Sequence, residues 1–353
     1  MKGCYFLGAN SDPKFEIREM NKTPLKAHEV LVQNISCGIC GTDVHIYEGG
    51  KGSADVVPPV VLGHEYSGIV VEVGSGVTTV AVGDHVALDP NIYCGLCTPC
   101  RMGKKQNCEN LFALGVNVDG GMAEYSVCPD TQCFIIKDTV DFDTAAMVEP
   151  LACAIHGIDN AQIKSGQKVL VIGGGTIGLI MVQLAKLQGA AVVVLSEPIE
   201  MRRRIGMEVG ADYTVNPMEE DLYERFYQIT NQYGADIVIE CVGKPSAAAQ
   251  AIAMAGRGAT VLLFSVPPVD ATIPLPLFDV YQKELKIVGS MINPDTHQRA
   301  VNLINSGSIK IRELITHRYG LNSVEDAIKM QMSSESIKVV VHPQEVVSSM
   351  CTT

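Results

Sequence analysis

The chain has 353 residues with a net charge of −12, and 47% of its residues are hydrophobic while 19% are charged. These values are typical of a globular protein of about two domains, and the lack of a Lys/Arg run argues against nucleic acid as a partner. The N-terminus lacks the apolar core of a signal peptide, and glycines split the most apolar stretch, residues 169–185. We therefore expect a cytoplasmic protein with no membrane partner, whose twelve cysteines more often bind metal or react than form disulfides.

The apolar runs predict three parts along the chain. Residues 1–150 hold short β-type runs broken by Gly, Pro and Asp, which is typical of an irregular antiparallel β domain. Residues 151–289 alternate apolar runs of strand length with helical segments, which predicts a parallel sheet with helices on both faces. Residues 290–353 follow the order helix, strand, helix, strand. The predicted fold class is α/β, with a β-rich domain followed by a doubly wound parallel-sheet domain.

The first motif whose side chains could bind a metal or react is ISCGICGTDVH, which carries Cys37, Cys40, Thr42 and His45. A C-x-x-C pair alone fits a redox dithiol, a zinc clip or half of a catalytic site. The rest of the chain has to decide between these three interpretations.

Further metal-ligand types follow in the stretches LGHEYSG and VEPLACAIHG, which hold His64, Glu65 and Glu149. Together with Cys40 they offer sulfur, nitrogen and oxygen, and three protein ligands plus water are the arrangement of catalytic zinc. Spacing alone does not bring these groups together. A hydrogen-bonded turn histidine and an acid at a helix N-terminus before Pro150 explain the same residues equally well.

A third motif, CGLCTPCRMGKKQNC, places four cysteines with gaps of two, two and seven residues: Cys94, Cys97, Cys100 and Cys108. Four thiolates this close can surround zinc tetrahedrally, and an iron–sulfur cluster is the competing interpretation. A site filled by four protein ligands has no open position, so we expect it to hold a loop in place. The remaining cysteines of the middle of the chain are interpreted as small buried hydrophobic residues: Cys128, Cys133, Cys153 and Cys241.

The stretch VLVIGGGTIGL contains G-x-G-x-x-G after a strand and at the start of a helix, a pattern that binds pyrophosphate at the helix N-terminus. The residues expected at the cofactor are Gly173, Gly175, Thr176, Ile177 and Gly178. Glu197 lies 19 residues after Gly178 at the end of the next strand, where an acid can bind the ribose hydroxyls of NAD. Arg202 follows closely and can accommodate a 2′-phosphate, so NAD is favoured and NADP stays open.

In combination, CGICGTDVH, GHEYSGIVVEVGSGV, VGDHV, the four-cysteine loop, EPLACAIHG and GGGTIG resemble the zinc-containing medium-chain alcohol dehydrogenases. The order of the motifs matches that family over essentially the whole chain, and their details resemble its polyol branch, the sorbitol, L-iditol and xylitol type. The resemblance implies a GroES-like catalytic domain, a Rossmann domain and a C-terminal segment that returns to the first domain. It also implies a homo-oligomer, a tetramer or a dimer.

The resemblance also implies roles for individual residues. Cys40, His64 and Glu65 match the ligands of the catalytic zinc, and Glu149 matches the glutamate that approaches this metal directly or through its water. The four cysteines of the third motif match the structural zinc site, which makes two zinc ions per chain. Thr42 and His45 match a relay that removes the proton of the substrate.

The implied reaction is the zinc-dependent, NAD-linked oxidation of a secondary alcohol of a polyol to a ketose, and the reverse reduction. Alternatives are an L-threonine or diol dehydrogenase, a polyol-phosphate dehydrogenase, and an NAD-binding protein without activity. In GSMINPDTH, Ile292 and Asn293 stand where the sorbitol type commonly has an arginine and an aromatic residue that reach the substrate. We therefore expect a less polar substrate pocket on that side, which puts sorbitol itself in doubt.

Overall fold

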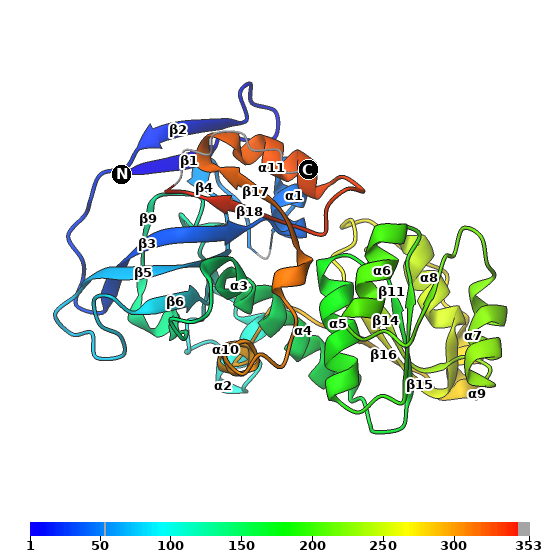
Figure 1. The fold of residues 1–353 in the computed structure, drawn as a ribbon. Coiled ribbons are helices and arrows are strands. Elements are labelled where there is room, and N and C mark those ends of the chain that lie inside the picture. The colour runs from blue at the N-terminus through cyan, green and yellow to red at the C-terminus, as the bar shows by residue number, and fades with distance from the viewer. Residues whose placement is uncertain (53, 345–353) are drawn as a thin grey trace. The chain divides into compact units, whose positions relative to one another are not determined.

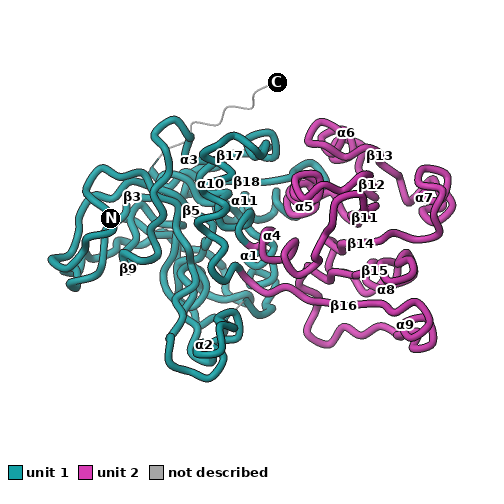
Figure 2. The backbone as a smooth tube through the Cα atoms, turned by 90° about the horizontal axis from the view of Figure 1, so that it is seen from below, with its two compact units in different colours: residues 1–152, 293–353 teal, residues 153–292 magenta. Residues whose placement is uncertain are grey.

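The computed structural model describes residues 1–52 and 54–344, and contacts divide the chain into two compact units (Figure 2). Unit 1 combines residues 1–152 with the returning residues from 293 onward, and unit 2 comprises residues 153–292. The boundaries predicted from sequence lie two and three residues before these limits, at 150 and 289. Within the described residues, no helix has both the length and the apolar character needed to cross a membrane.

Unit 1 is built around a mixed sheet of seven strands in the order β10-β6-β5-β3-β18-β17, with β9 also paired to β3. The two strands that carry the central motifs, β3 (Glu29–Gly38) and β5 (Glu65–Val73), are antiparallel and pair Gly38 with Glu65. On the other side of β3 lies β18 (Lys338–His342), which pairs Val340 with Gly38 (Figure 1). The last strand of the described chain therefore lies beside the third.

The remaining elements of unit 1 surround this sheet. Its other strands are β6 (His85–Leu88), β9 (Tyr125–Pro129), β10 (Cys133–Ile135) and β17 (Ile315–Gly320). Two smaller sheets contain β1 (Lys2–Phe6), β2 (Phe15–Glu19) and β4 (Val60–Val61), and β7 (Asn91–Ile92) and β8 (Phe112–Ala113). The helices are α1 (Gly41–Tyr47), α2 (Thr98–Arg101), α3 (Phe142–Ala146), α10 (His297–Asn305) and α11 (Val324–Gln331). Helix α4 (Val148–Ala161) begins in unit 1 and ends in unit 2.

Unit 2 is a parallel sheet of six strands in the order β13-β12-β11-β14-β15-β16. The strands are β11 (Lys168–Ile172), β12 (Val192–Ser196), β13 (Tyr213–Val215), β14 (Ala235–Glu240), β15 (Ala255–Leu263) and β16 (Lys286–Gly289). The helices are α5 (Thr176–Leu187), α6 (Glu200–Glu208), α7 (Leu222–Thr230), α8 (Pro245–Ala253) and α9 (Leu277–Lys283). The strand order reverses at β11, and open sheets of this kind bind ligands beyond the strand ends at that point.

The predicted fold class is confirmed. Strands β11, β12 and β14 are buried almost throughout, because apolar runs with helices on both faces lose contact with water on both sides. The returning segment follows the predicted order of helix, strand, helix and strand as α10, β17, α11 and β18. Its last residues, 345–353, lie outside the described part of the chain.

Candidate metal and cofactor sites

Three of the predicted zinc ligands lie together in unit 1. Cys40 immediately precedes α1, His64 immediately precedes β5, and Glu65 is the first residue of β5. The pairing of β3 with β5 brings these segments side by side. The ligand atoms of Cys40, His64 and Glu65 all lie within 4.8 Å of one another, and His64 and Glu65 are buried. This set could hold a metal ion.

The electrostatics around His64 show why a cation fits this set. Burial lowers the pKa of His64, but Asp43, Cys40 and Glu149 raise it by more, so that it lies well above its ordinary value. Several groups that can carry negative charge therefore surround one buried imidazole, and a bound cation would balance such charge. The mixture of sulfur, nitrogen and oxygen donors suits zinc.

Asp43 is a member of the site that sequence reasoning missed. Its Oδ1 lies 3.6 Å from Nδ1 of His64, and its Oδ2 accepts a hydrogen bond of 2.8 Å from the backbone N–H of Cys40. Neither Oδ1 of Asp43 nor Nδ1 of His64 has a hydrogen-bond partner among the described residues. A carboxylate behind a metal-binding histidine orients its ring, so Asp43 can steer both His64 and the start of α1.

Lys338 is a second member that the sequence did not reveal. Its Nζ donates to Oε2 of Glu65 and, at 2.9 Å, to the carbonyl of Ile39, and both ends of the ion pair are only 2% exposed. Gly38 makes room for this pair, because a Cβ there would lie 2.8 Å from Cε of Lys338 and would overlap Glu65. Because the two charged residues are 273 positions apart in the sequence, no local motif predicts their contact.

Glu149, Thr42 and His45 complete the predicted set. Glu149 is buried in the first turn of α4, and its charge contributes to the raised pKa of His64, although it is outside the group of three ligand atoms described above. Thr42 and His45 are half-buried and three positions apart on α1, so that their side chains leave the same face of the helix.

The four cysteines of the third motif also lie together. The ligand atoms of Cys94, Cys97, Cys100 and Cys108 are all within 4.8 Å of one another. The sulfur of Cys94 accepts backbone hydrogen bonds from Cys97 at 3.4 Å and Leu96 at 3.5 Å, which lower the pKa of this thiol to about 6. A thiol held ready as thiolate, with three more sulfurs around it, fits a closed tetrahedral zinc site.

The glycine turn and its acid lie together in unit 2. Gly173 has a φ of +99°, which favours glycine, and α5 begins at Thr176 directly after Gly175. Oε2 of Glu197 accepts a hydrogen bond of 2.6 Å from the backbone N–H of Gly174, so the buried carboxylate lies against the turn. No side chain fits at Gly178, because its Cβ would overlap the carbonyl of Gly173. Arg202 lies on α6.

Asn293, whose position the resemblance associates with the substrate side, takes part in a buried hydrogen-bond network. It is fully buried, its Oδ1 accepts from Asn91 at 2.6 Å, and its Nδ2 lies 3.0 Å from Nδ1 of His297. This network ties the returning segment to the strand before the four-cysteine loop. Ile292, the last residue of unit 2, has a φ of +47°, an uncommon backbone conformation for a β-branched residue.

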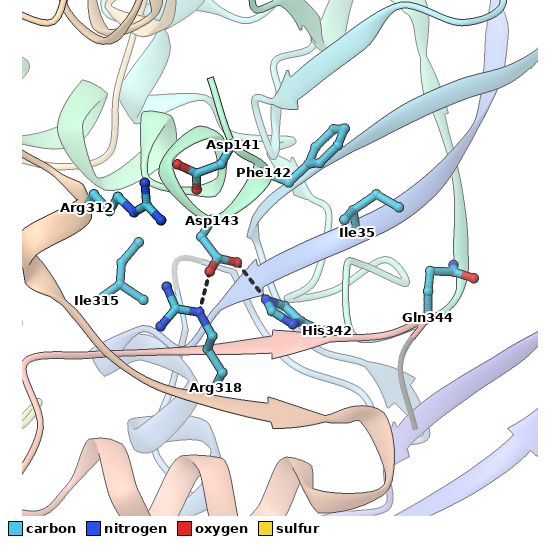
Figure 3. Close-up of a pocket in the computed structure, with 9 residues that line it drawn as sticks. All are labelled: Ile35, Asp141, Phe142, Asp143, Arg312, Ile315, Arg318, His342 and Gln344. Atoms are coloured by element: carbon cyan, nitrogen blue, oxygen red, sulfur yellow. Dashed lines mark hydrogen bonds and ion pairs between the residues drawn. The ribbon is translucent and has the colours of Figure 1, made fainter. Parts of the chain in front are cut away.

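A cavity of about 680 Å³ lies elsewhere in unit 1 (Figure 3). Its wall contains Asp143, which accepts hydrogen bonds of 2.7 Å from Nε of Arg318 and from Ser36 and lies 2.7 Å from Nε2 of His342. Burial alone would raise the pKa of Asp143, but these partners lower it to about 2. None of the predicted site residues lines this cavity.

Fold and sites together define the class of protein. The chain contains one set of ligands with sulfur, imidazole and carboxylate and a second set of four cysteines. Such a combination indicates one reactive and one structural metal site. A parallel sheet with a glycine turn and a buried acid indicates a dinucleotide. A chain with these features is a metal-dependent oxidoreductase.

Comparison with known proteins identifies the family. Residues 26–138 match the family described as Alcohol dehydrogenase GroES-like domain, and residues 176–306 match the family described as Zinc-binding dehydrogenase. The chain belongs to the zinc-containing medium-chain alcohol dehydrogenases, as its motifs predicted.

Individual relatives agree with this membership. A sorbitol dehydrogenase of Halalkalibacterium halodurans is 36% identical over 93% of this chain and 96% of its own length. An L-threonine 3-dehydrogenase of Pyrococcus horikoshii is 35% identical over 88% of this chain and 90% of its own length. A solved zinc-binding dehydrogenase of Sinorhizobium meliloti 1021 bound to NADP is 39% identical with a TM-score of 0.91, covering 97% of this chain and all of the other. The protein is a zinc-type alcohol or polyol dehydrogenase that uses a nicotinamide dinucleotide.

Proposed function

We propose that the protein oxidises a secondary alcohol of a polyol to the ketose, with NAD as hydride acceptor, and catalyses the reverse reduction. The observation that carries the proposal is the cluster of half-buried Cys40 with buried His64 and Glu65 in a chain of this family. Zinc bound there would act as a Lewis acid that lowers the pKa of the alcohol, and the nicotinamide would accept the hydride.

The residues in and around this cluster, and the four-cysteine set, have separate proposed roles. Cys40, His64 and Glu65 would hold the metal, and Glu149 would approach it directly or through water. Lys338 holds one carboxylate oxygen of Glu65 and so fixes the direction of that side chain. The four-cysteine set holds a second zinc, which stabilises the loop around α2.

Thr42 and His45 are the proposed route for the proton of the alcohol. The hydroxyl of Thr42 accepts this proton while passing its own onward, and His45 lies one helical turn further along α1. Both side chains are half-buried.

The choice of NAD over NADP rests on Glu197. Its carboxylate is buried against Gly174 of the glycine turn, where it can bind ribose hydroxyls and would repel a 2′-phosphate. The relative bound to NADP makes a direct comparison necessary. Turnover with NAD and NADP side by side tests this choice, and a kcat/KM that is higher with NADP would overturn it.

Among the alternatives to the polyol assignment, L-threonine has the most support from the relatives. The stretch EPLACAIHG favours polyols, whereas several relatives at about 35% identity are L-threonine 3-dehydrogenases. Activity on sorbitol, xylitol, galactitol, threonine and 2,3-butanediol separates the two. The proposal expects the highest kcat/KM on a polyol, and a preference for threonine would replace it with the alternative.

A homo-oligomer is proposed from the free edge of the sheet of unit 2. Strand β16 is the last strand of that sheet, and α9 next to it presents Leu277, Phe278 and Tyr281, which are 67–79% exposed. An apolar group beside a free strand edge is typical of an interface between chains. Light scattering should give a dimer or tetramer, and the double variant Phe278→Asp, Tyr281→Asp should shift it toward monomer. A monomeric wild type would contradict the proposal.

The free thiols support a reducing compartment such as the cytoplasm. None of the eleven cysteines in the described part of the chain is joined to another in a disulfide, although several are partly accessible.

A further inference from the structure

Two cysteines outside both metal sets face each other in unit 1. The sulfur atoms of Cys128 and Cys133 are 3.7 Å apart. Cys128 lies on β9 and is 1% exposed, while Cys133 is the first residue of β10 and is half-buried. The sequence interpretation of both as inert packing residues does not account for this contact.

The backbone around both thiols is held by sheet pairing. Cys128 is paired with Val30 of β3, and Cys133 is paired with Leu88 of β6. The two neighbouring strands therefore fix the positions from which the side chains meet. A disulfide requires the sulfur atoms to approach from this distance of 3.7 Å to about 2.05 Å.

The connecting residues are also fixed. The backbone N–H of Asp130 donates to the carbonyl of His28 at 3.0 Å, and its Oδ2 accepts from Thr79 at 3.0 Å. Nε2 of Gln132 donates to the carbonyls of Asp89 at 2.8 Å and Asn91 at 2.9 Å. Sheet pairing fixes the backbone of both cysteines, and these hydrogen bonds fix the residues between them. The fold itself therefore keeps the two thiols next to each other.

The two thiols are not equivalent. The hydrogen bond with Cys133 and then burial raise the pKa of Cys128 well above its usual value. Cys128 therefore tends to keep its proton, and its sulfur is in hydrogen-bond contact with that of Cys133. Because Cys133 is also the more accessible of the two, it is the sulfur that an oxidant reaches first.

We propose that Cys128 and Cys133 form a reversible oxidation site for hydrogen peroxide and organic hydroperoxides, with an intrachain disulfide as the product. The thiolate of Cys133 attacks one peroxide oxygen, which forms an S–O bond, breaks the O–O bond and releases water or an alcohol after protonation. The sulfur of Cys128 then attacks the sulfenic acid, so that the S–S bond forms, the S–O bond breaks and water leaves with the thiol proton. Two thiols lose two electrons, and one peroxide gains them.

Peptide mapping tests this site on the full-length, zinc-loaded protein. After graded hydrogen peroxide, thiols are alkylated under denaturing conditions, and chymotrypsin cleaves after Tyr125 and Phe134 to release residues 126–134 with both cysteines and no other. We expect this peptide to carry no alkyl group and to be two hydrogen atoms lighter than its reduced, unalkylated form, and reduction with dithiothreitol before alkylation should restore the doubly alkylated peptide. The zinc content should stay unchanged, because neither cysteine belongs to a metal set.

The controls separate this site from general oxidation. Cys4 is 3% exposed, and its peptide should stay fully alkylated at the same dose. In Cys128→Ser, Cys133 should stop at a sulfenic acid that dimedone traps, whereas in Cys133→Ser, Cys128 should remain a thiol. The proposal fails if both cysteines stay alkylated until Cys4 or the zinc ligands oxidise. It also fails if the disulfide forms only after zinc is lost, or if Cys133 proceeds to sulfinic acid beside an unoxidised Cys128.

Discussion

Lys338 and Glu65 form a buried ion pair between the first residues of β18 and β5, on either side of the strand that ends before Cys40. Burial lowers the pKa of Lys338, but Glu65 and Cys40 raise it by more, so the ammonium stays charged inside the protein. The returning segment therefore places a positive charge next to Glu65, one of the proposed zinc ligands in the first segment. The stability of the fold and the direction of a proposed zinc ligand depend on the same contact.

Removal of the ammonium group should destabilise unit 1. Lys338→Met leaves the carboxylate of Glu65 buried without its partner, which typically costs about 3–5 kcal/mol. Denaturant unfolding monitored by circular dichroism measures the loss. Lys329→Met is the matched control, because the Lys329–Glu325 pair is largely exposed and should contribute less than about 1 kcal/mol. Equal losses in the two variants would contradict the importance of the buried pair.

A methyl group at Gly38 should disturb the same pair by steric overlap. Gly38→Ala places a Cβ against Glu65 and 2.8 Å from Cε of Lys338, so we expect a loss of about 1–3 kcal/mol together with reduced zinc content. Gly41→Ala is the control three positions later, because nothing lies within 4 Å of its Cβ. Unfolding curves and metal analysis of both variants measure the stability and the zinc content. If Gly38→Ala is as stable as Gly41→Ala and binds as much zinc, the argument is refuted.

The Asp143 network predicts a loss of stability in acid. The pKa of Asp143 is about 2 in the folded protein and about 3.9 in an unfolded chain, so its partners favour the folded state above pH 4. This contribution, about 2–3 kcal/mol, should disappear as the pH falls from 4 to 2. The difference in unfolding free energy between wild type and Asp143→Asn should therefore shrink over that window. The exposed control Asp270→Asn should show no such change. A difference between wild type and Asp143→Asn that does not vary with pH would contradict the prediction.

Loss of the Thr42 hydroxyl should affect turnover and leave the metal in place. A positioned proton-transfer group typically contributes about 10²–10⁴ in rate, so Thr42→Val should lower kcat by that range. Thr42→Ser keeps the hydroxyl and should retain most of the activity. Steady-state kinetics with zinc analysis test this, and a Thr42→Val enzyme with near-normal kcat would remove Thr42 from the route of the proton.

Groups of residues that are close together in the sequence were easier to predict than groups whose members are far apart. The four cysteines could be predicted as one group because they lie within a single loop, and the glycine turn because strand, turn and helix are consecutive. Cys40, His64 and Glu65 needed family resemblance, since only the pairing of β3 with β5 brings them together.

Contacts between distant segments escaped prediction altogether. Lys338 reaches Glu65 through the pairing of β18 with β3, and no local pattern marks it. The buried hydrogen bond between Asn293 and Asn91 joins residues 202 positions apart and was not predicted either. Cys128 and Cys133 are near in sequence, yet only the two strand pairings show that their thiols meet.

Zinc content of two cysteine variants tests the central claim most directly. Cys37 and Cys40 lie three positions apart in one C-x-x-C, but Cys37 is fully buried and outside the metal set, whereas Cys40 belongs to it. Elemental analysis should find two zinc ions per chain in the wild type and in Cys37→Ala, and one in Cys40→Ala. Two zinc ions in Cys40→Ala, or one in Cys37→Ala, would contradict the assignment of the catalytic metal.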